Sequence, residues 1–311
     1  MSSGNFLFII LMVLGPMVSI SSSSWLICWV GIELSFMGII PILLSNNYYF
    51  SLSKESTMKY FCIQALSSGL LLCGGLLFFN FPYNMGMITE LIFMFSLLLK
   101  LGVFPGHFWV PSVVSGLDWV PMLLMLTWQK IPPFFFLVCL VSSSSWMCSI
   151  LLVLGGLSAL IGGLIGLNQT KLGPMLGASS ISHSGWVVMG SVYGNLWMYF
   201  LIYCVSLSIL VYLLMMEDYF LSGMMILSLS GLPPFVLFLG KWSILKSALG
   251  LGFSYWFICL PLFGSIMSLF FYLKFFYSFY LEEKFKSLNK LGIFSGVSSL
   301  IFLGVSYITL L

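Results

Sequence analysis

Four ionisable side chains lie within otherwise apolar sequence: Glu33, Lys100, Lys130 and Lys241. A charged side chain at the centre of a bilayer costs about 2.5–3.5 kcal/mol on insertion scales. Burial favours the neutral amine of a lysine, whereas a nearby carboxylate favours the charged form. A buried lysine beside a carboxylate that can move therefore takes up and releases a proton. We predict that Glu33 is the partner of Lys100 in such a pair.

Other charged or titratable residues have two interpretations. Lys246 and Lys274 lie near expected helix ends, where a lysine can extend its amine to the headgroups. Glu90 lies within two turns of an expected helix start and could do either. His107 follows a proline-containing break, and His183 lies in a serine-rich segment, SSISHSGW. A lone buried histidine is more often a packing residue, but at membrane depth either histidine could relay protons.

The sequence shows few signs of any other kind of functional site. The seven cysteines lie in apolar runs without a CxxC motif, so we interpret them as packing residues rather than disulfides or metal ligands. The sequence has no phosphate-binding loop, nucleophile elbow or dinucleotide fingerprint. The net charge of +3 is too small and scattered for nucleic-acid binding. We therefore expect no metal, nucleotide or nucleic acid on this chain.

The composition of the chain indicates which kind of fold must position these four residues. The chain has 311 residues, of which 60% are hydrophobic and only 6% are charged. Soluble domains carry about 25% charged residues, so this chain cannot build a solvated surface. We predict a polytopic all-α membrane protein with one transmembrane domain over residues 1–311. About eleven spans are long enough to cross the hydrocarbon layer, near 4–21, 25–45, 57–79, 85–116, 119–141, 146–167, 172–191, 195–216, 223–248, 255–281 and 290–310.

Three of these spans are expected to break or kink. The span at 85–116 contains Pro105 and Pro111, the span at 119–141 contains Pro132 and Pro133, and the span at 223–248 contains the run Gly-Leu-Pro-Pro at 231–234. Proline removes a backbone donor and clashes with the preceding turn. A break at membrane depth frees peptide dipoles that only a protein-lined or wet interior can satisfy. Simple kinking is the alternative for any single proline, but lysines near the breaks favour an ion path.

Lysine placement predicts the orientation. With eleven spans, the loops after the second, sixth and tenth lie on the side of the N-terminus. These loops or their edges hold six of the eleven lysines, at positions 54, 59, 171, 284, 286 and 290, and the opposite connections hold none. By the positive-inside rule the N-terminus faces the side of synthesis and the C-terminus faces away.

At these same residues the sequence resembles the subunit 2 family of the mitochondrially encoded NADH dehydrogenase, respiratory complex I. The matching segments extend from the second span to the ninth, and in this order they are highly specific: WVGIEL at 29–34, KYFCIQA at 59–65, KLGVFPGHFWVP at 100–111, LTWQKIPP at 126–133, NQTKL at 168–172, SSISHSGW at 179–186 and GLPPF at 231–235 with Lys241-Trp242. The last two spans resemble the family only in hydrophobicity.

The resemblance implies an antiporter-like subunit of the proton-pumping membrane arm, with broken helices and inverted repeats, in the mitochondrial inner membrane. It implies a matrix-side N-terminus and an intermembrane-space C-terminus, in agreement with the lysine pattern. Counterparts of Glu33, Lys100, Lys130 and Lys241 form the family's buried hydrophilic axis. The expected partners are other membrane-arm subunits, lipid, protons and water. NADH, FMN, Fe–S clusters and ubiquinone are expected in other subunits, and we expect no redox site in this chain.

Two features depart from the family pattern. Lys171 is not followed by the second basic residue that is frequent there, and Gly240 precedes Lys241 where a proline is common, so the helix should bend less sharply. Two other functions remain open. A stand-alone cation/proton antiporter would transport sodium without redox partners. A passive scaffold of the membrane arm would keep pumping after conservative loss of all four buried charges.

Overall fold

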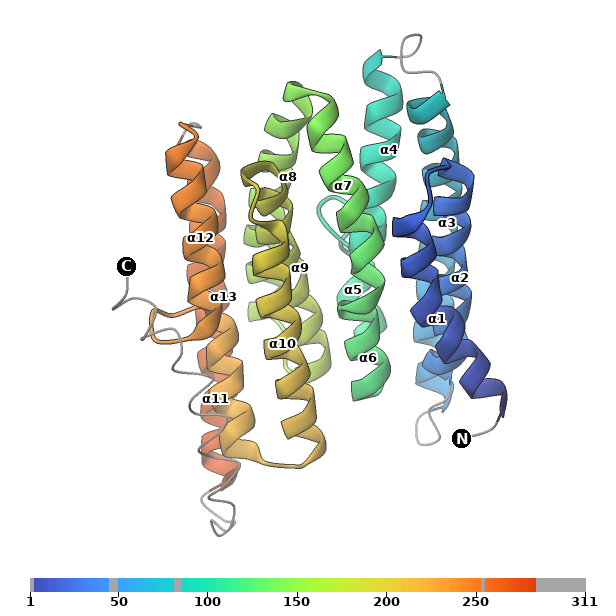
Figure 1. The fold of residues 1–311 in the computed structure, drawn as a ribbon. Coiled ribbons are helices and arrows are strands. Elements are labelled where there is room, and N and C mark those ends of the chain that lie inside the picture. Colours follow the sequence, from blue (N-terminus) through green and yellow to red (C-terminus); the bar gives the residue numbers. More distant parts are fainter. Residues whose placement is uncertain (1–2, 45–49, 81–85, 253–254, 284–311) are drawn as a thin grey trace. The chain divides into compact units, whose positions relative to one another are not determined.

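The computed structural model describes residues 3–44, 50–80, 86–252 and 255–283 (Figure 1). In these ranges the chain forms thirteen α-helices and one short 3-10 helix, without any strand. The chain divides into two compact units. Unit 1 comprises residues 1–150 and 173–177, and unit 2 comprises residues 151–172 and 178–311. The predicted span at 290–310 lies outside the described residues, as do Lys284, Lys286 and Lys290.

Unit 1 begins with three continuous helices and ends with two broken segments. The continuous helices are α1 (Ser3–Ser21), α2 (Trp25–Leu44) and α3 (Phe50–Asn80). The fourth segment divides into α4 (Gly86–Leu101) and α5 (Trp109–Val114). The fifth divides into α6 (Trp119–Leu126), the 3-10 helix η1 (Trp128–Lys130) and α7 (Ile131–Ser143). Figure 1 shows α4 and α5 at different levels along the unit, and likewise α7 and α6.

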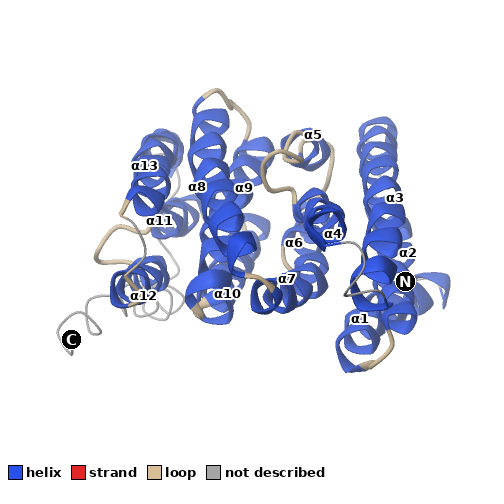
Figure 2. Cartoon of the chain, turned by 90° about the horizontal axis from the view of Figure 1, so that it is seen from above, coloured by secondary structure: helices blue, strands red, loops and turns tan. Residues whose placement is uncertain are grey.

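Unit 2 repeats this order of segments, except that its fifth segment is continuous. Its first three helices are α8 (Ser145–Leu167), α9 (Leu172–Tyr193) and α10 (Leu196–Met215), of which α8 and α9 have a few residues in unit 1. The fourth segment again divides, into α11 (Tyr219–Ser230) and α12 (Val236–Gly250), and the fifth is α13 (Trp256–Glu283). Figure 2, seen from above, shows α11 and α12 nearly end-on.

The helices have the length and surface of membrane spans. Within the described ranges six are long and apolar enough to cross a membrane: Trp25–Leu44, Ser51–Phe79, Trp119–Ser143, Ser145–Leu167, Leu196–Met215 and Trp256–Leu281. Large apolar side chains are exposed along many of the helices, among them Leu7, Met37 and Leu201. Such a surface is stable in lipid, where apolar exposure carries no cost. The predicted all-α polytopic class with broken helices is confirmed.

Proline alone does not decide where a segment breaks. Pro16, Pro41 and Pro261 lie inside continuous helices. The breaks after α4 and α11 instead begin at a glycine with positive φ, Gly102 at +69° and Gly231 at +71°. A left-handed residue directly after a helix turns the chain away from the axis, and glycine adopts this conformation without a Cβ penalty. The prediction of breaks in three spans is confirmed, and two of the three breaks begin at these glycine turns.

Most buried polar groups are serines that bond within their own helix. The hydroxyls of Ser96, Ser158 and Ser228 each donate to the carbonyl oxygen three residues earlier, at 2.6–2.8 Å. A serine therefore tolerates burial without a partner on another helix. Buried lysine and histidine side chains are too long for this solution. Their contacts therefore identify positions where a side chain of one helix forms a hydrogen bond or an ion pair with another helix.

Candidate functional site: buried amines at helix breaks

The break after α4 exposes backbone carbonyls that side chains satisfy. Because the chain turns away from the helix axis at Gly102, the last carbonyls of α4 lack the donors that a continuous helix would supply four residues later, and the Leu99 carbonyl oxygen accepts instead from Gly102 N–H at 3.2 Å. Trp109 Nε1 donates to the Leu99 carbonyl oxygen at 3.1 Å, and Gln64 Nε2 donates to that of Lys100 at 3.3 Å. The first donor comes from α5, beyond the break, and the second from α3. The broken end of α4 is thus fixed from both sides.

Lys100 occupies the last turn of α4, and Glu33 of α2 faces it. The Lys100 Nζ lies 3.9 Å from Glu33 Oε1, and the two side chains are 5% and 18% exposed. Neither of these two atoms has a hydrogen-bond partner among the described residues. The predicted pairing is confirmed, and its length shows an ion pair held by charge rather than by a hydrogen bond. A pair of this kind can separate without losing a bond.

Lys130 is the last residue of η1, at the second break of unit 1. The chain leaves α6 at Thr127, whose hydroxyl donates to the Leu123 carbonyl oxygen at 2.7 Å. Pro132 and Pro133 occupy the first positions of α7, where a missing N–H is harmless. The break therefore precedes the two prolines and places Lys130, which is 4% exposed, between the two helices.

The short helix η1 is anchored to the neighbouring helices by its first two side chains. Gln129 exchanges two hydrogen bonds with Ser35 of α2: its Nε2 donates to the Ser35 carbonyl oxygen, and its Oε1 accepts from the Ser35 hydroxyl, each at 3.2 Å. Trp128 Nε1 donates to the Met12 carbonyl oxygen of α1 at 2.9 Å. These contacts fix the turn from which Lys130 projects.

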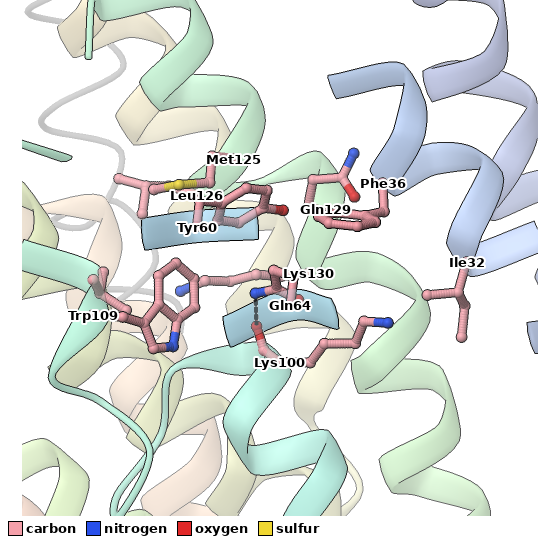
Figure 3. Close-up of a pocket in the computed structure, with 11 residues that line it drawn as sticks. Ile32, Phe36, Tyr60, Gln64, Lys100, Trp109, Met125, Leu126, Gln129 and Lys130 are labelled. Carbon is pink, nitrogen blue, oxygen red and sulfur yellow. Dashed lines mark hydrogen bonds between the residues drawn. The ribbon is translucent and has the colours of Figure 1, made fainter. Parts of the chain in front are cut away.

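Lys100 and Lys130 line one small chamber in unit 1. Its volume is about 10 Å³, close to the minimum for a single water molecule. The remaining lining residues are mostly apolar, with Gln64, Gln129 and the Tyr60 ring among them. Figure 3 shows the Lys130 amine on the side of Trp109 and the Lys100 amine on the side of Ile32. The two amines share a chamber and point to its opposite ends.

Unit 2 holds its lysine at a break in another way. Lys241 of α12 donates from Nζ to the Ser230 carbonyl oxygen, the last of α11, at 2.7 Å. In an unbroken helix this oxygen would accept from the N–H of residue 234, which is Pro234 and has none. The amine therefore replaces a missing backbone donor at the negative end of α11. It is 7% exposed and lies 5.8 Å from the centre of the Trp186 ring.

Gly231 makes this contact possible. Its φ of +71° turns the chain at the end of α11, and a Cβ at this position would lie 2.8 Å from Lys241 Nζ. Glycine is thus required both by the backbone conformation and by the space for the amine. Gly240, the other departure noted in the sequence, lies inside the continuous helix α12.

His183 of α9 lies at the centre of a tyrosine cluster in the same unit. Its Nδ1 is 2.9 Å from the hydroxyl oxygen of Tyr199 in α10, and its Nε2 is 3.1 Å from that of Tyr272 in α13. The Tyr203 ring lies against the imidazole with 4.9 Å between ring centres. All four side chains are at most 2% exposed. Both ring nitrogens are therefore engaged by phenols.

The other histidine belongs to the break after α4. His107 Nδ1 lies 3.1 Å from the Pro105 carbonyl oxygen, and the ring packs 4.0 Å from that of Phe108. The side chain is buried but is not among those lining the chamber. These contacts stabilise the turn between α4 and α5. A proton-relay role for His107 stays a prediction.

The structure thus groups the predicted residues by unit. Glu33, Lys100 and Lys130 lie together in unit 1, and His183 and Lys241 lie in unit 2. Lys246 and Lys274 are exposed, and Lys274 Nζ donates to the Gln169 carbonyl oxygen at 3.1 Å; an approach of either amine to the headgroups stays a prediction. Glu90 accepts from the Ser144 hydroxyl at 2.9 Å. Among the described residues no group of three or more histidine, cysteine or acidic side chains could hold a metal ion.

Sequence reasoning missed the neutral residues that complete these clusters. Gln64, Trp109 and Gln129 all lie in the segments that carry the resemblance, where a buried amide or indole was a usable signal. Tyr199 and Tyr272 lie in long apolar runs rich in tyrosine and phenylalanine, which gave no such signal. Only the tertiary contacts with His183 distinguish them.

The fold and the buried amines define a class of protein: polytopic membrane proteins with broken helices, of the antiporter-like kind. A family model described as "NADH:quinone oxidoreductase/Mrp antiporter, TM" matches residues 22–221. The chain is similar to a chain of respiratory complex I from Thermus thermophilus, with a TM-score of 0.79 and 23% identity over 98% of this chain and 78% of that one. It is also similar to a chain of an Mrp complex from a Dietzia species, with a TM-score of 0.77 and 15% identity over 86% and 59% of the two chains.

Relatives of higher identity narrow the class. The chain is 37% identical to NADH-ubiquinone oxidoreductase chain 2 of Albinaria caerulea over 88% of each chain. It is 38% identical to the protein of that name from Branchiostoma floridae, over 86% of this chain and 83% of the relative. The Anopheles gambiae protein is 33% identical over 98% of both chains. The chain therefore belongs to the NADH-ubiquinone oxidoreductase chain 2 family.

Proposed function

We propose that the chain is a proton-conducting membrane subunit of NADH-ubiquinone oxidoreductase, respiratory complex I, in the mitochondrial inner membrane. The relatives that bear this name are animal proteins, and they match almost the whole chain. The observation that carries the proposal is the burial of Lys100, Lys130 and Lys241 at helix breaks. Three buried amines are costly in hydrocarbon, and interior ionisable groups of this kind mark ion pathways.

The partners follow from the same role. Other membrane-arm subunits and lipid surround the chain, and protons and water are its cargo. NADH, FMN, Fe–S clusters and ubiquinone bind to other subunits, so this chain contributes to the enzyme without a redox site of its own. The lysine asymmetry supports a matrix-side N-terminus and an intermembrane-space C-terminus.

The ion pair of unit 1 supplies the switch. While Glu33 faces Lys100, the carboxylate stabilises the charged amine; when the pair opens, the low-dielectric surroundings favour the neutral amine and a proton leaves. Because the 3.9 Å contact involves no hydrogen bond, a small movement of α2 or α4 is sufficient. Ubiquinone reduction elsewhere in the complex would drive that movement. The proton passes by Lys130 towards Lys241, which releases it when repulsion or pairing changes.

The test is Lys241→Met in the assembled complex, reconstituted in liposomes, with protons pumped per electron pair as the readout. Methionine keeps an apolar side chain of similar length and removes the proton-carrying amine. Loss of a proton-transferring group slows transfer by about 10²–10⁴-fold, so pumping through this chain should stop. Lys246→Met, an exposed lysine of the same helix, is the matched control and should pump normally. Normal pumping by an assembled Lys241→Met complex would remove Lys241 from the path.

A further inference from the structure

The tyrosine cluster of unit 2 has a geometry that packing alone does not require. His183 Nδ1 and Nε2 lie 2.9 and 3.1 Å from two phenol oxygens, which come from α10 and α13 respectively. A neutral imidazole carries one proton, so one nitrogen donates and the other accepts. The two phenols therefore take opposite roles towards the ring, and the cluster is a chain of hydrogen bonds with a direction.

Tyr203 shows that a phenol can pack at this site without such a bond. Its ring contacts the same imidazole at 4.9 Å, yet its hydroxyl, equally buried, has no hydrogen-bond partner among the described residues. The hydroxyls of Tyr199 and Tyr272, by contrast, both reach a histidine nitrogen, and that of Tyr272 also has a hydrogen bond with the Ser179 side chain. The chain offers an internal reference for the difference between ring packing and hydroxyl bonding.

One end of the cluster lies beside the buried amine of Lys241. A Cβ at position 240 would lie 2.7 Å from a ring carbon of Tyr199, so this ring lies directly against the backbone of α12 one residue before the lysine. The Trp186 ring is stacked parallel to that of Tyr199, with 6.5 Å between their centres, and Lys241 Nζ lies 5.8 Å from the centre of Trp186. Tyr199 therefore lies against α12 directly beside the proposed proton carrier, and Tyr272 contacts the other nitrogen of the imidazole.

We propose that Tyr199, His183 and Tyr272 form a proton wire that connects the surroundings of Lys241 with the α13 side of unit 2. This inference rests on the proposed function and assigns two further residues to the path. In the starting state the Tyr199 hydroxyl donates to Nδ1, and Nε2–H donates to Tyr272. A proton delivered to the Tyr199 oxygen displaces the hydroxyl proton onto Nδ1. The Nε2 proton then passes to Tyr272, which releases its own.

This transfer is balanced and needs no redox partner. One proton enters at Tyr199, one leaves at Tyr272, and the imidazole changes from the Nε2–H to the Nδ1–H tautomer. Rotation of the two hydroxyls and return of the ring to its first tautomer prepare the next transfer. The ring is never required to hold a lasting charge, which suits an interior where a charged imidazole would be costly. The wire thus needs no water molecule between its three members.

The experiment compares three hydroxyl deletions in the assembled complex reconstituted in liposomes: Tyr199→Phe, Tyr272→Phe and Tyr203→Phe. The first two interrupt the wire while they keep the ring, and we expect proton transfer through this chain to slow by about 10²-fold or more. The third removes a hydroxyl outside the wire and should pump as the unmodified complex does. NADH oxidation in the presence of an uncoupler measures how much complex is assembled. Normal pumping per electron pair by Tyr199→Phe and Tyr272→Phe would overturn the wire.

His183→Gln separates proton transfer from structure. The glutamine amide keeps a donor and an acceptor in the same place but does not exchange protons between them. If the cluster only holds helices together, His183→Gln should assemble and pump, and the proposal fails. If it is a wire, the variant should assemble and lose pumping. Lys241→Met in the same series distinguishes the two proposals, because failed pumping there with normal pumping in the tyrosine variants rejects the wire alone.

Discussion

Units 1 and 2 both place a buried lysine at a broken helix, but they stabilise its amine differently. In unit 1, Lys100 belongs to the helix before the break, and its amine faces the carboxylate of Glu33 on another helix at 3.9 Å without a hydrogen bond. In unit 2 the lysine belongs to the helix that begins, and its amine donates at 2.7 Å to the last carbonyl oxygen of the helix before it. One partner is a titratable side chain, and the other is backbone.

This difference separates an adjustable site from a fixed one. The Glu33–Lys100 pair depends on charge and distance, so both protonation and a small helix movement change it. The Lys241 contact depends on a helix end whose conformation Gly231 and Pro234 maintain, and no protonation event can remove that carbonyl. We therefore expect the ion pair of unit 1 to respond to events elsewhere in the complex. The amine of Lys241 in unit 2 should stay in place while those events occur.

The largest expected effect breaks the charge pair of unit 1. Glu33→Leu leaves Lys100 buried without its carboxylate, and removal of one partner of a buried ion pair typically costs about 3–5 kcal/mol. Glu33→Leu should therefore lower the thermal stability and the amount of assembled complex. The double variant Glu33→Leu/Lys100→Met removes both charges and should recover most of the assembly without recovering pumping. Equal assembly of the single and double variants would show that the pair contributes no stability.

A smaller effect tests the fixed site of unit 2. Gly231→Ala places a Cβ at a positive φ, which costs about 1–2 kcal/mol, and within 2.8 Å of Lys241 Nζ. Gly194→Ala is the matched control, because Gly194 also ends a helix with a positive φ, +87°, but its Cβ would meet no atom within 4 Å. Both variants should lose similar stability in thermal unfolding, and only Gly231→Ala should also lose pumping. Equal pumping by the two variants would argue against a role for the Lys241–Ser230 contact.

The smallest expected effect concerns the broken end of α4. Gln64→Leu removes the side-chain donor to the Lys100 carbonyl oxygen, and a typical intramolecular hydrogen bond contributes about 0.5–1.5 kcal/mol. Gln169→Leu removes a similar bond to the Ile165 carbonyl oxygen, but at a half-buried position near the end of α8. Thermal unfolding should show a larger decrease for Gln64→Leu than for Gln169→Leu. The reverse order would show that other groups cap α4.

The sequence allowed the broken helices and the buried lysines to be predicted, because both depend on local chemistry. Proline and glycine in an apolar run imply a break, and a lysine with apolar sequence on both sides has few ways to reach water. It did not reveal that Gln64 caps α4 or that Tyr199 and Tyr272 bracket His183, since these contacts depend on how helices are rotated against each other. Pro132 and Pro133 show the local limit: they predicted a break, but its position before Lys130 follows from where proline is tolerated at a helix start.

The size of the chamber around Lys100 and Lys130 has a bioenergetic consequence. A space of about 10 Å³ holds at most about one water molecule, which is too few to form a continuous file across the subunit. Under the proposed function, this chamber would block a water-borne proton path in the conformation described here, so the gradient would not drain back through it. Conduction as proposed would then require this chamber to widen and take up water, so one movement would govern both leakage and turnover.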